Sequence, residues 1–320
     1  MTKITLFLAT LSALCLHVAS AQAGLVRTCV SLAKGSDANA STSCHCTTPC
    51  RTFATAAANT LAEGEITVLD PGDYGGLVIT RSISINNDSG GEASITVSEN
   101  TTGIIVNAVN GASYVNLRGI TIQGVGFGTT TGLRFNTGFS LTMTNCVVRN
   151  HTGNGIEFNP NASSNLAVSN TVVSDNGKIG IAVFPPSGSG AVNVALDRVE
   201  AYNNSSDGVQ INGDFGFGTI QATVADSVAA NNGRTGFSVF SLTGHATTSL
   251  MLVRSVAANN ATGLHAQNAP ATLRVSQSTV TGNTTGLSAT GGGSLLSYGD
   301  NNIDGNGAGT ETPTGTLTKK

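Results

Sequence analysis

The chain has 320 residues, of which 39% are hydrophobic and only 10% are charged, and its formal net charge is −3. A nearly neutral chain lacks the positive field that attracts nucleic acid or an anionic membrane surface, so we expect no nucleic acid partner. Its 40 glycines and low charge are also found in disordered chains, but the apolar residues alternate with polar ones in short runs, which favours a folded β protein.

Residues 1–23 have the features of a secretion signal. Lys3 supplies the positive charge, an apolar segment follows at residues 4–16, and a small-x-small cleavage site ends at Ala23. After removal of this signal no apolar run is long enough to cross a bilayer, so we expect no membrane span. We therefore predict a secreted or periplasmic protein that begins near Gly24.

Residues 24–64 are predicted to form an N-terminal cap with one helix at residues 51–63. Phe53, Ala57 and Leu61 are four residues apart and would share one apolar face of this helix. We expect that face to cover the first coil of the repeats that follow.

Four cysteines, Cys29, Cys44, Cys46 and Cys50, lie within the predicted cap. In an exported protein they favour two disulfides, and since a Cys44–Cys46 bridge is geometrically poor, Cys29 should pair with one of these two and Cys50 with the other. The alternative is a Cys/His zinc site, but the spacing is not that of a usual zinc knuckle, and we predict no metal and no cofactor. Cys146 occupies an apolar repeat position, where we expect a buried free thiol.

Nine glycines recur at intervals of 23 to 29 residues, and each precedes an apolar–any–apolar triplet. They are Gly76, Gly103, Gly132, Gly155, Gly180, Gly208, Gly236, Gly263 and Gly286. A nearly constant period of this length predicts stacked coils, and the Val-, Ile- and Thr-rich segments between the glycines favour strands. The Leu spacing of leucine-rich repeats and the Gly-Gly-x-Gly-x-Asp pattern of calcium-binding coils are absent. We predict an all-β, right-handed parallel β-helix of about nine to ten coils at residues 65–306, followed by a disordered tail at residues 307–320.

An asparagine occurs at the turn before many of these glycines. The set comprises Asn150, Asn176, Asn204, Asn232, Asn260, Asn283 and Asn306. Side-chain amides that are stacked at the strand spacing can hydrogen-bond one another, so we predict a structural Asn ladder. A polar stripe for ligands is the alternative.

The middle residue of each apolar–any–apolar triplet is expected to point outward. This row places Arg134 beside Glu157 on the next coil. Asp207, just before Gly208, lies beside the row and two coils from Glu157. Two carboxyl groups about 5–10 Å apart can hydrolyse a glycosidic bond, and Arg134 would lower the pKa of Glu157, as a base or nucleophile requires. The simpler interpretation is a surface ion pair between neighbouring strands.

Four phenylalanines fall in loops or just past a strand, at Phe184, Phe215, Phe217 and Phe240. They can form an apolar ridge along the rod that binds a chain-like ligand, or they can pack against the coils.

The signal, the coil length, the asparagine corner and the N-terminal helix together resemble the pectate-lyase-like superfamily of right-handed β-helices. Residues 35–39, 48–53 and 69–75 look like the opening segment of bacterial members of unassigned activity. Enzymes of this superfamily commonly act on polysaccharides. The Arg-x-x-Pro-x-x-Arg signature of its pectate lyases and the Asn-Thr-Asp, Gly-His-Gly and Arg-Ile-Lys motifs of its polygalacturonases are absent here.

The missing motifs and the few charges on the outward row favour an exported protein whose repetitive surface binds carbohydrate or another cell-envelope partner without catalysis. The alternative is a polysaccharide-active enzyme, a lyase or a glycoside hydrolase, with an unfamiliar site around Arg134, Glu157 and Asp207.

Overall fold

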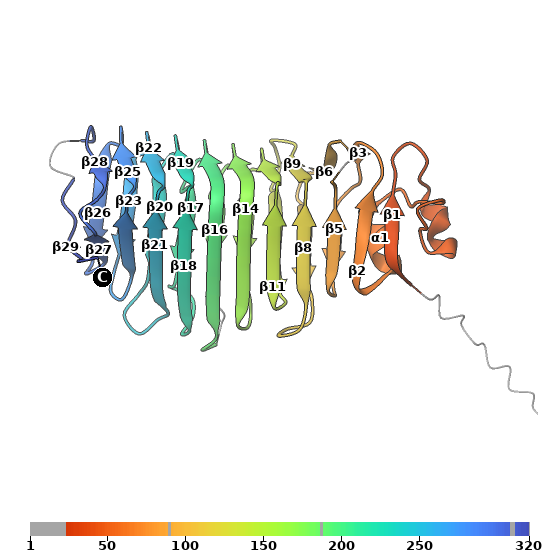
Figure 1. Cartoon of the computed structure of the whole chain (residues 1–320), viewed down its shortest axis with the longest axis horizontal. Helices are drawn as coiled ribbons and strands as arrows, with labels where there is room; N and C mark the ends of the chain where they lie inside the picture. Colours follow the sequence, from red (N-terminus) through yellow and green to blue (C-terminus); the bar gives the residue numbers. More distant parts are fainter. Residues whose placement is uncertain (1–23, 89–90, 186–187, 308–310, 320) are drawn as a thin grey trace, which may run out of the picture.

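The computed structural model describes residues 24–319 except 89–90, 186–187 and 308–310, so the predicted signal at residues 1–23 lies outside the described residues. The described chain forms a rod of stacked coils with all named strand pairings parallel, from the N-terminal cap at one end to β29 at the other (Figure 1). This confirms the predicted parallel β-helix.

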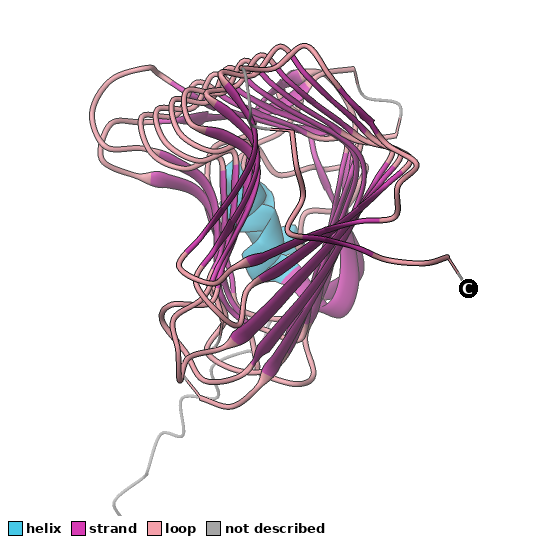
Figure 2. Ribbon diagram, turned by 90° about the vertical axis from the view of Figure 1, so that its left-hand side faces the viewer, coloured by secondary structure: helices cyan, strands magenta, loops and turns pink. Residues whose placement is uncertain are grey.

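Each coil contributes strands to three faces that surround a narrow interior, as the view along the rod shows (Figure 2). One face is a nine-stranded sheet with one strand from each coil, which gives eight full turns from first strand to last, slightly fewer than predicted. Its strands are β4 (Leu77–Ile79), β7 (Thr102–Asn107), β10 (Thr131–Thr137), β13 (Ile156–Phe158), β15 (Ile181–Val183), β17 (Val209–Asn212), β20 (Thr235–Phe240), β23 (Thr262–Gln267) and β26 (Thr285–Thr290).

The other two faces merge into one 20-stranded sheet. One row comprises β1 (Leu25–Val30), β2 (Thr60–Val68), β5 (Ile83–Asn86), β8 (Tyr114–Arg118), β11 (Ser140–Thr144), β18 (Thr219–Ala225), β21 (Thr247–Val253), β24 (Thr272–Ser276), β27 (Ser294–Ser297) and β29 (Gly315–Thr316). The other comprises β3 (Gly72–Asp73), β6 (Ala93–Val97), β9 (Ile120–Gly124), β12 (Val147–Arg149), β19 (Val228–Ala230), β22 (Val256–Ala258), β25 (Thr279–Thr281) and β28 (Asn302–Ile303). The rows join because β14 (Ser164–Ser174) and β16 (Ala191–Tyr202) run around the corner without a break.

The interior is filled by apolar side chains that stack on their equivalents in the next coil. Phe135 lies on Phe158 with ring centroids 4.4 Å apart, and both rings are buried. Such stacks remove apolar surface from water along the whole rod. Cys146 is free and buried among these residues, and burial raises the pKa of its thiol.

The N-terminal cap holds two disulfides, Cys29–Cys46 and Cys44–Cys50, in agreement with the predicted pairing pattern. A short 3₁₀-helix, η1 (Asp37–Thr42), lies within the cap. The two disulfides confine this loop-rich cap, which has little apolar surface of its own.

The predicted helix at residues 51–63 is too long. The observed helix, α1 (Phe53–Asn59), ends where Thr60 turns its Oγ1 back to the Ala56 carbonyl at 2.8 Å and begins β2. Strand pairing of β2 with β1 competes with helix continuation and prevails. As a result Leu61 is 43% exposed instead of sharing the buried face with Phe53.

The predicted disorder at residues 307–320 is also wrong for the described part of this segment. β29 adds a parallel strand to β27, and Thr314 both donates to and accepts from the backbone of Leu295 at 2.8 Å. Lys319 Nζ lies 2.7 Å from Asp300 Oδ2. The last coil would otherwise leave strand-edge N–H and C=O groups unpaired, and this segment supplies partners for some of them.

The interior at one corner carries a continuous ladder of asparagine side chains. Each Nδ2 donates to the Oδ1 of the next asparagine at 2.9–3.0 Å, through Asn176, Asn204, Asn232, Asn260, Asn283 and Asn306. Each Oδ1 also accepts the backbone N–H of the preceding member. Glu311 closes the ladder, because its Oε1 accepts both N–H and Nδ2 of Asn306.

Asn150 is not part of this ladder, contrary to the prediction. It is exposed and in the left-handed region (φ 60°), and its amide donates to the Gly124 carbonyl. Its counterparts in the next coils are Asp175 and Asn203, which also have positive φ and directly precede ladder residues. His151 therefore occupies the first ladder position, and its N–H donates to Asn176 Oδ1.

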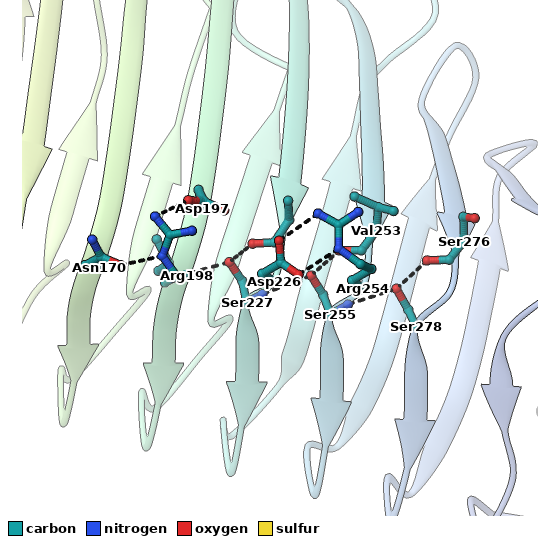
Figure 3. Close-up of polar contacts among 12 residues, drawn as sticks. Asn170, Asp197, Arg198, Asp226, Ser227, Val253, Arg254, Ser255, Ser276 and Ser278 are labelled. Carbon is teal, nitrogen blue, oxygen red and sulfur yellow. Dashed lines mark hydrogen bonds and ion pairs between the residues drawn. The ribbon is translucent and has the colours of Figure 1, made fainter.

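A second, hydroxyl ladder lies at the corner between the two rows of the 20-stranded sheet (Figure 3). Ser227 and Ser255 each accept the backbone N–H of the equivalent residue one coil earlier, at 3.0–3.1 Å, and Ser278 does the same for Ser255. Outside the same corner, Arg254 contacts both carboxylate oxygens of Asp226. Each of these serine hydroxyls accepts from the preceding coil and donates to the carbonyl two residues earlier in its own coil.

We predict that Asn232→Ala lowers the free energy of unfolding by about 2–4 kcal/mol, because it removes the buried acceptor of the Asn204 N–H and Nδ2 and the donor to the Ala201 carbonyl. Urea denaturation followed by circular dichroism measures the change. Asn231→Gly is the matched control, since Asn231 is exposed with φ 56° and glycine tolerates that conformation. Equal midpoints for the two variants would show that the ladder does not contribute this stability.

A second prediction concerns pH. Burial lowers the pKa of His151 to about 4 although its ring contacts the Ile122 carbonyl, whereas the unfolded chain takes up this proton near pH 6.5. The contribution of neutral His151 to the free energy of unfolding is therefore fully present above pH 6.5. It declines as the pH falls towards 4, by about 2 kcal/mol between pH 7 and pH 5. His151→Asn should remove this part of the pH dependence in urea titrations. An identical decline in both proteins would refute the assignment.

Candidate functional site

The outward row of the nine-stranded sheet is aligned by the strand register. Arg134 pairs with Glu157, Glu157 with Ala182, and Ala182 with Gln210 of the following coils. The row is not uniformly exposed, however: Ala182 is 0% and Gln210 is 6% exposed. The buried Ala182 separates two polar clusters, one around Glu157 and one around Asp207 that includes Gln210.

The first cluster surrounds the carboxylate of Glu157. Arg134 Nε lies 3.2 Å from Glu157 Oε1, and Asn154 Nδ2 donates to Glu157 Oε2 at 3.2 Å. The carboxylate lies in the wall of an open pocket of about 360 Å³, which is also lined by Asn154, Asn159, Phe184 and Phe215. We call this the Glu157 pocket. It combines hydrogen-bonding groups with aromatic surface, which is the composition of small-ligand sites.

The second cluster is built around Asp207, whose side chain is fully buried. Its Oδ1 accepts the Thr235 N–H at 3.2 Å and lies 3.3 Å from Arg234 Nε. Its Oδ2 accepts from Gln210 Nε2 at 2.9 Å and from Ser238 Oγ at 2.6 Å. Four polar contacts compensate for the loss of water around the buried carboxylate.

Arg234 and His265 both contact the ring of Phe240. The Arg234 guanidinium carbon is 5.2 Å from the centroid of Phe240, and the His265 ring meets the same phenylalanine edge-on at 5.4 Å. Burial lowers the pKa of His265, and the charge of Arg234 adds to this effect while that of Asp207 opposes it. An imidazole next to a guanidinium therefore favours its neutral form.

Asp207 and Glu157 do not form a pair of accessible acids. Their strands are separated by two strand spacings of about 4.8 Å, and Asp207 is buried with both oxygens already engaged. The geometry therefore does not favour the two-carboxylate arrangement of a glycoside hydrolase.

Of the four loop phenylalanines, Phe215 and Phe217 are 69% and 66% exposed, and Phe184 is half-buried. The rings of Phe184 and Phe215 meet edge-on with centroids 5.8 Å apart. Phe240 was predicted to belong to the same ridge, but it is only 5% exposed because Arg234 and His265 cover it. Among these four residues, the exposed aromatic surface therefore lies on the loops that follow β15 and β17.

Two further groups were not predicted as site residues: Asp214 on the loop after β17 and His245 on the loop after β20. In the described part of the chain, Asp214 Oδ1 and His245 Nδ1 are buried without a hydrogen-bond partner. Burial raises the pKa of Asp214, and the charge of His245 opposes this shift. Phe217 stacks on His245 at 5.6 Å.

Arg234 and Asn154 were also missed. The available signal was coil spacing: Arg234 follows Asp207 by 27 residues, which is one coil, as Glu157 follows Arg134 by 23. Opposite charges one coil apart become neighbours in a parallel stack. Asn154 lies three residues before Glu157 and had no comparable signal.

Among the described residues no group of three or more His, Cys, Asp or Glu side chains is arranged to hold a metal ion. Nor is any helix in this part of the chain long and apolar enough to span a membrane.

A family model described as "Right handed beta helix region" matches residues 102–307. A search of curated protein sequences returned no significant match. Among solved structures, pectate lyase Pel9A is similar at a TM-score of 0.62 and 17% identity, over 92% of this chain and 78% of that one. The A-module of mannuronan C-5 epimerase AlgE4 from Azotobacter vinelandii gives a TM-score of 0.45 and 14% identity, over 80% of this chain and 91% of that one. At 17% identity, the likeness to Pel9A shows a shared fold and nothing further.

We predict that Asp207→Ala destabilises the protein by about 3 kcal/mol, because Ser238, Gln210 and Arg234 lose a buried partner together. Glu157→Gln is the comparison, since its pair with Arg134 is partly exposed and should contribute about 1 kcal/mol or less. Urea midpoints measure both changes. If Asp207→Ala is as stable as Glu157→Gln, Asp207 does not organise this cluster.

Proposed function

The chain belongs to the family of right-handed β-helix proteins, and on this premise we propose that it is an exported protein that binds an extended polysaccharide along its nine-stranded sheet. Export is supported by the signal-like residues 1–23 and by the two disulfides of the cap, which form in oxidising compartments.

The observation that carries this proposal is the Glu157 pocket. Sugars present hydroxyl groups at their edges and apolar C–H groups on their faces. The pocket offers both complements, because Glu157 and Asn154 supply polar atoms while Phe184 and Phe215 supply ring surface. Phe215 is 69% exposed, so its ring is accessible to a ligand that lies along this face.

The direction of the sheet also suits a chain-like ligand. Outward positions on successive coils lie about 4.8 Å apart along the rod, and the row includes Arg134, Glu157 and His265. A polymer that lies parallel to the rod axis would meet the Glu157 pocket and the Arg234 cluster in turn. The fold shared with a protein named as a pectate lyase supports this choice of ligand class.

A second candidate is a polysaccharide-active enzyme, and one observation favours it. The Glu157 carboxylate lines the wall of the pocket, 3.2 Å from Arg134, where it would contact a bound chain. Binding without turnover remains the proposal because Asp207, the second acid of the predicted hydrolytic pair, is buried and engaged.

Binding to a panel of neutral and acidic polysaccharides, with and without calcium, tests this proposal by affinity electrophoresis and calorimetry. We expect Phe215→Ala to weaken binding about 10-fold, which corresponds to roughly 1.4 kcal/mol of lost ring contact. Phe127→Ala is the matched control, since Phe127 is 60% exposed in the loop between β9 and β10.

The same samples are assayed for new reducing ends and for unsaturated uronate absorbance. Products that disappear in Glu157→Ala would establish the enzyme instead. A folded protein that binds none of the polymers, or a Phe215→Ala variant that binds as well as the native chain, would contradict the proposed binding face.

A further inference from the structure

Asp207 is an unusual residue for its position. The equivalent residue is Asn154 two coils earlier and Thr235, Thr262 and Thr285 in the coils that follow, all of them uncharged. A fully buried carboxylate costs several kcal/mol unless its oxygens are engaged, and a threonine would avoid that cost. The rod itself therefore does not require an acid here.

The contacts of Asp207 show what the acid achieves. Gln210, Ser238 and the Thr235 N–H hold the carboxylate in place, and the carboxylate in turn lies 3.3 Å from Arg234 Nε. Phe240 supports the guanidinium from one side at 5.2 Å. The arginine is thus fixed at its Nε edge and against one ring face, which restricts a side chain that is otherwise flexible.

The rest of the guanidinium remains accessible. The Arg234 side chain is 49% exposed, and in the described part of the chain Asp207 is the acid with which it forms an ion pair. A guanidinium has five N–H donors in a planar fork that matches a carboxylate. With its Nε edge used by Asp207, its terminal nitrogens are available for a second acceptor.

His265 adds a second group on the next coil. It pairs in register with Ser238, contacts the edge of Phe240, and its Nε2 lies 3.2 Å from Thr290 Oγ1. Burial lowers the pKa of this imidazole, so it is neutral near pH 7 and offers one hydrogen-bond donor without a second positive charge.

We propose that Arg234, oriented by Asp207 and assisted by His265, is a subsite for the carboxylate of a uronate unit in the bound polysaccharide. This inference rests on the proposed function and specifies the ligand as an acidic polymer. A single exposed guanidinium with a neutral neighbour matches a monoanionic carboxylate, and the aromatic ring beneath it keeps the fork at a fixed height above the sheet.

The test compares two matched polymers, a polyuronate and the same polymer with its carboxylates reduced to alcohols. The native chain should bind the polyuronate about 10-fold more tightly, and Arg234→Gln should abolish that preference while binding of the reduced polymer stays unchanged. Arg234→Lys should retain only part of the preference, because an ammonium lacks the planar fork.

Arg149→Gln is the matched control, since Arg149 is exposed on another face and its Nε donates to Gln123. Circular dichroism and urea midpoints verify that each variant is folded. Equal binding of both polymers by the native chain, or a preference that survives Arg234→Gln, would overturn this subsite while leaving the binding face intact. Failure of both polymers to bind would overturn the subsite and the proposed function together.

Discussion

The structure depends on one constraint, the in-register parallel stacking of coils at the strand spacing. In such a stack a buried polar group at a corner faces its equivalents on the neighbouring coils, so a residue that can bond to its own kind satisfies the whole corner. Asparagine satisfies this requirement because its amide carries both donor and acceptor. The ladder from Asn176 to Asn306 therefore hydrogen-bonds itself and also satisfies the backbone N–H groups of its own corner. The ladder ends where this symmetry is lost, at His151 and at Glu311.

The same stacking converts sequence spacing into contact on the outer surface. Arg134 and Glu157 are neighbours because one coil separates them, and so are Asp207 and Arg234. In the interior this regularity favours identical residues, as the serine and asparagine ladders show. On the outward row of the nine-stranded sheet, adjacent residues instead differ in size and charge from coil to coil. Regular positions stabilise the rod, whereas the irregular ones distinguish one part of its surface from another.

The contrast between regular and irregular positions explains which features the sequence could predict. The glycine period indicated the fold, and cysteine spacing indicated the disulfides, because both follow from repetition or covalent geometry. Asn150 was misplaced because a left-handed corner and a ladder position both favour asparagine, and the sequence does not show which of two adjacent positions faces inward. The end of the helix at Asn59 depended on competition with strand β2, and the burial of Phe240 depended on Arg234 and His265 from neighbouring strands. These outcomes are decided by tertiary contacts and not by local pattern.

The positions that depart from the repeat are therefore the most informative about function. A rod that served only as a spacer could place threonine at position 207, as it does in the equivalent positions of the three following coils. Instead it buries a carboxylate and surrounds it with Gln210, Ser238 and the Thr235 N–H, all of which converge on the acid that holds Arg234. Such an arrangement adds desolvation cost without adding apolar contact, so its contribution lies in the fixed orientation of the guanidinium. Two coils away, the Glu157 pocket also combines an irregular charge with an exposed aromatic ring. Both features lie on one face and along one axis, as recognition of a single extended chain requires.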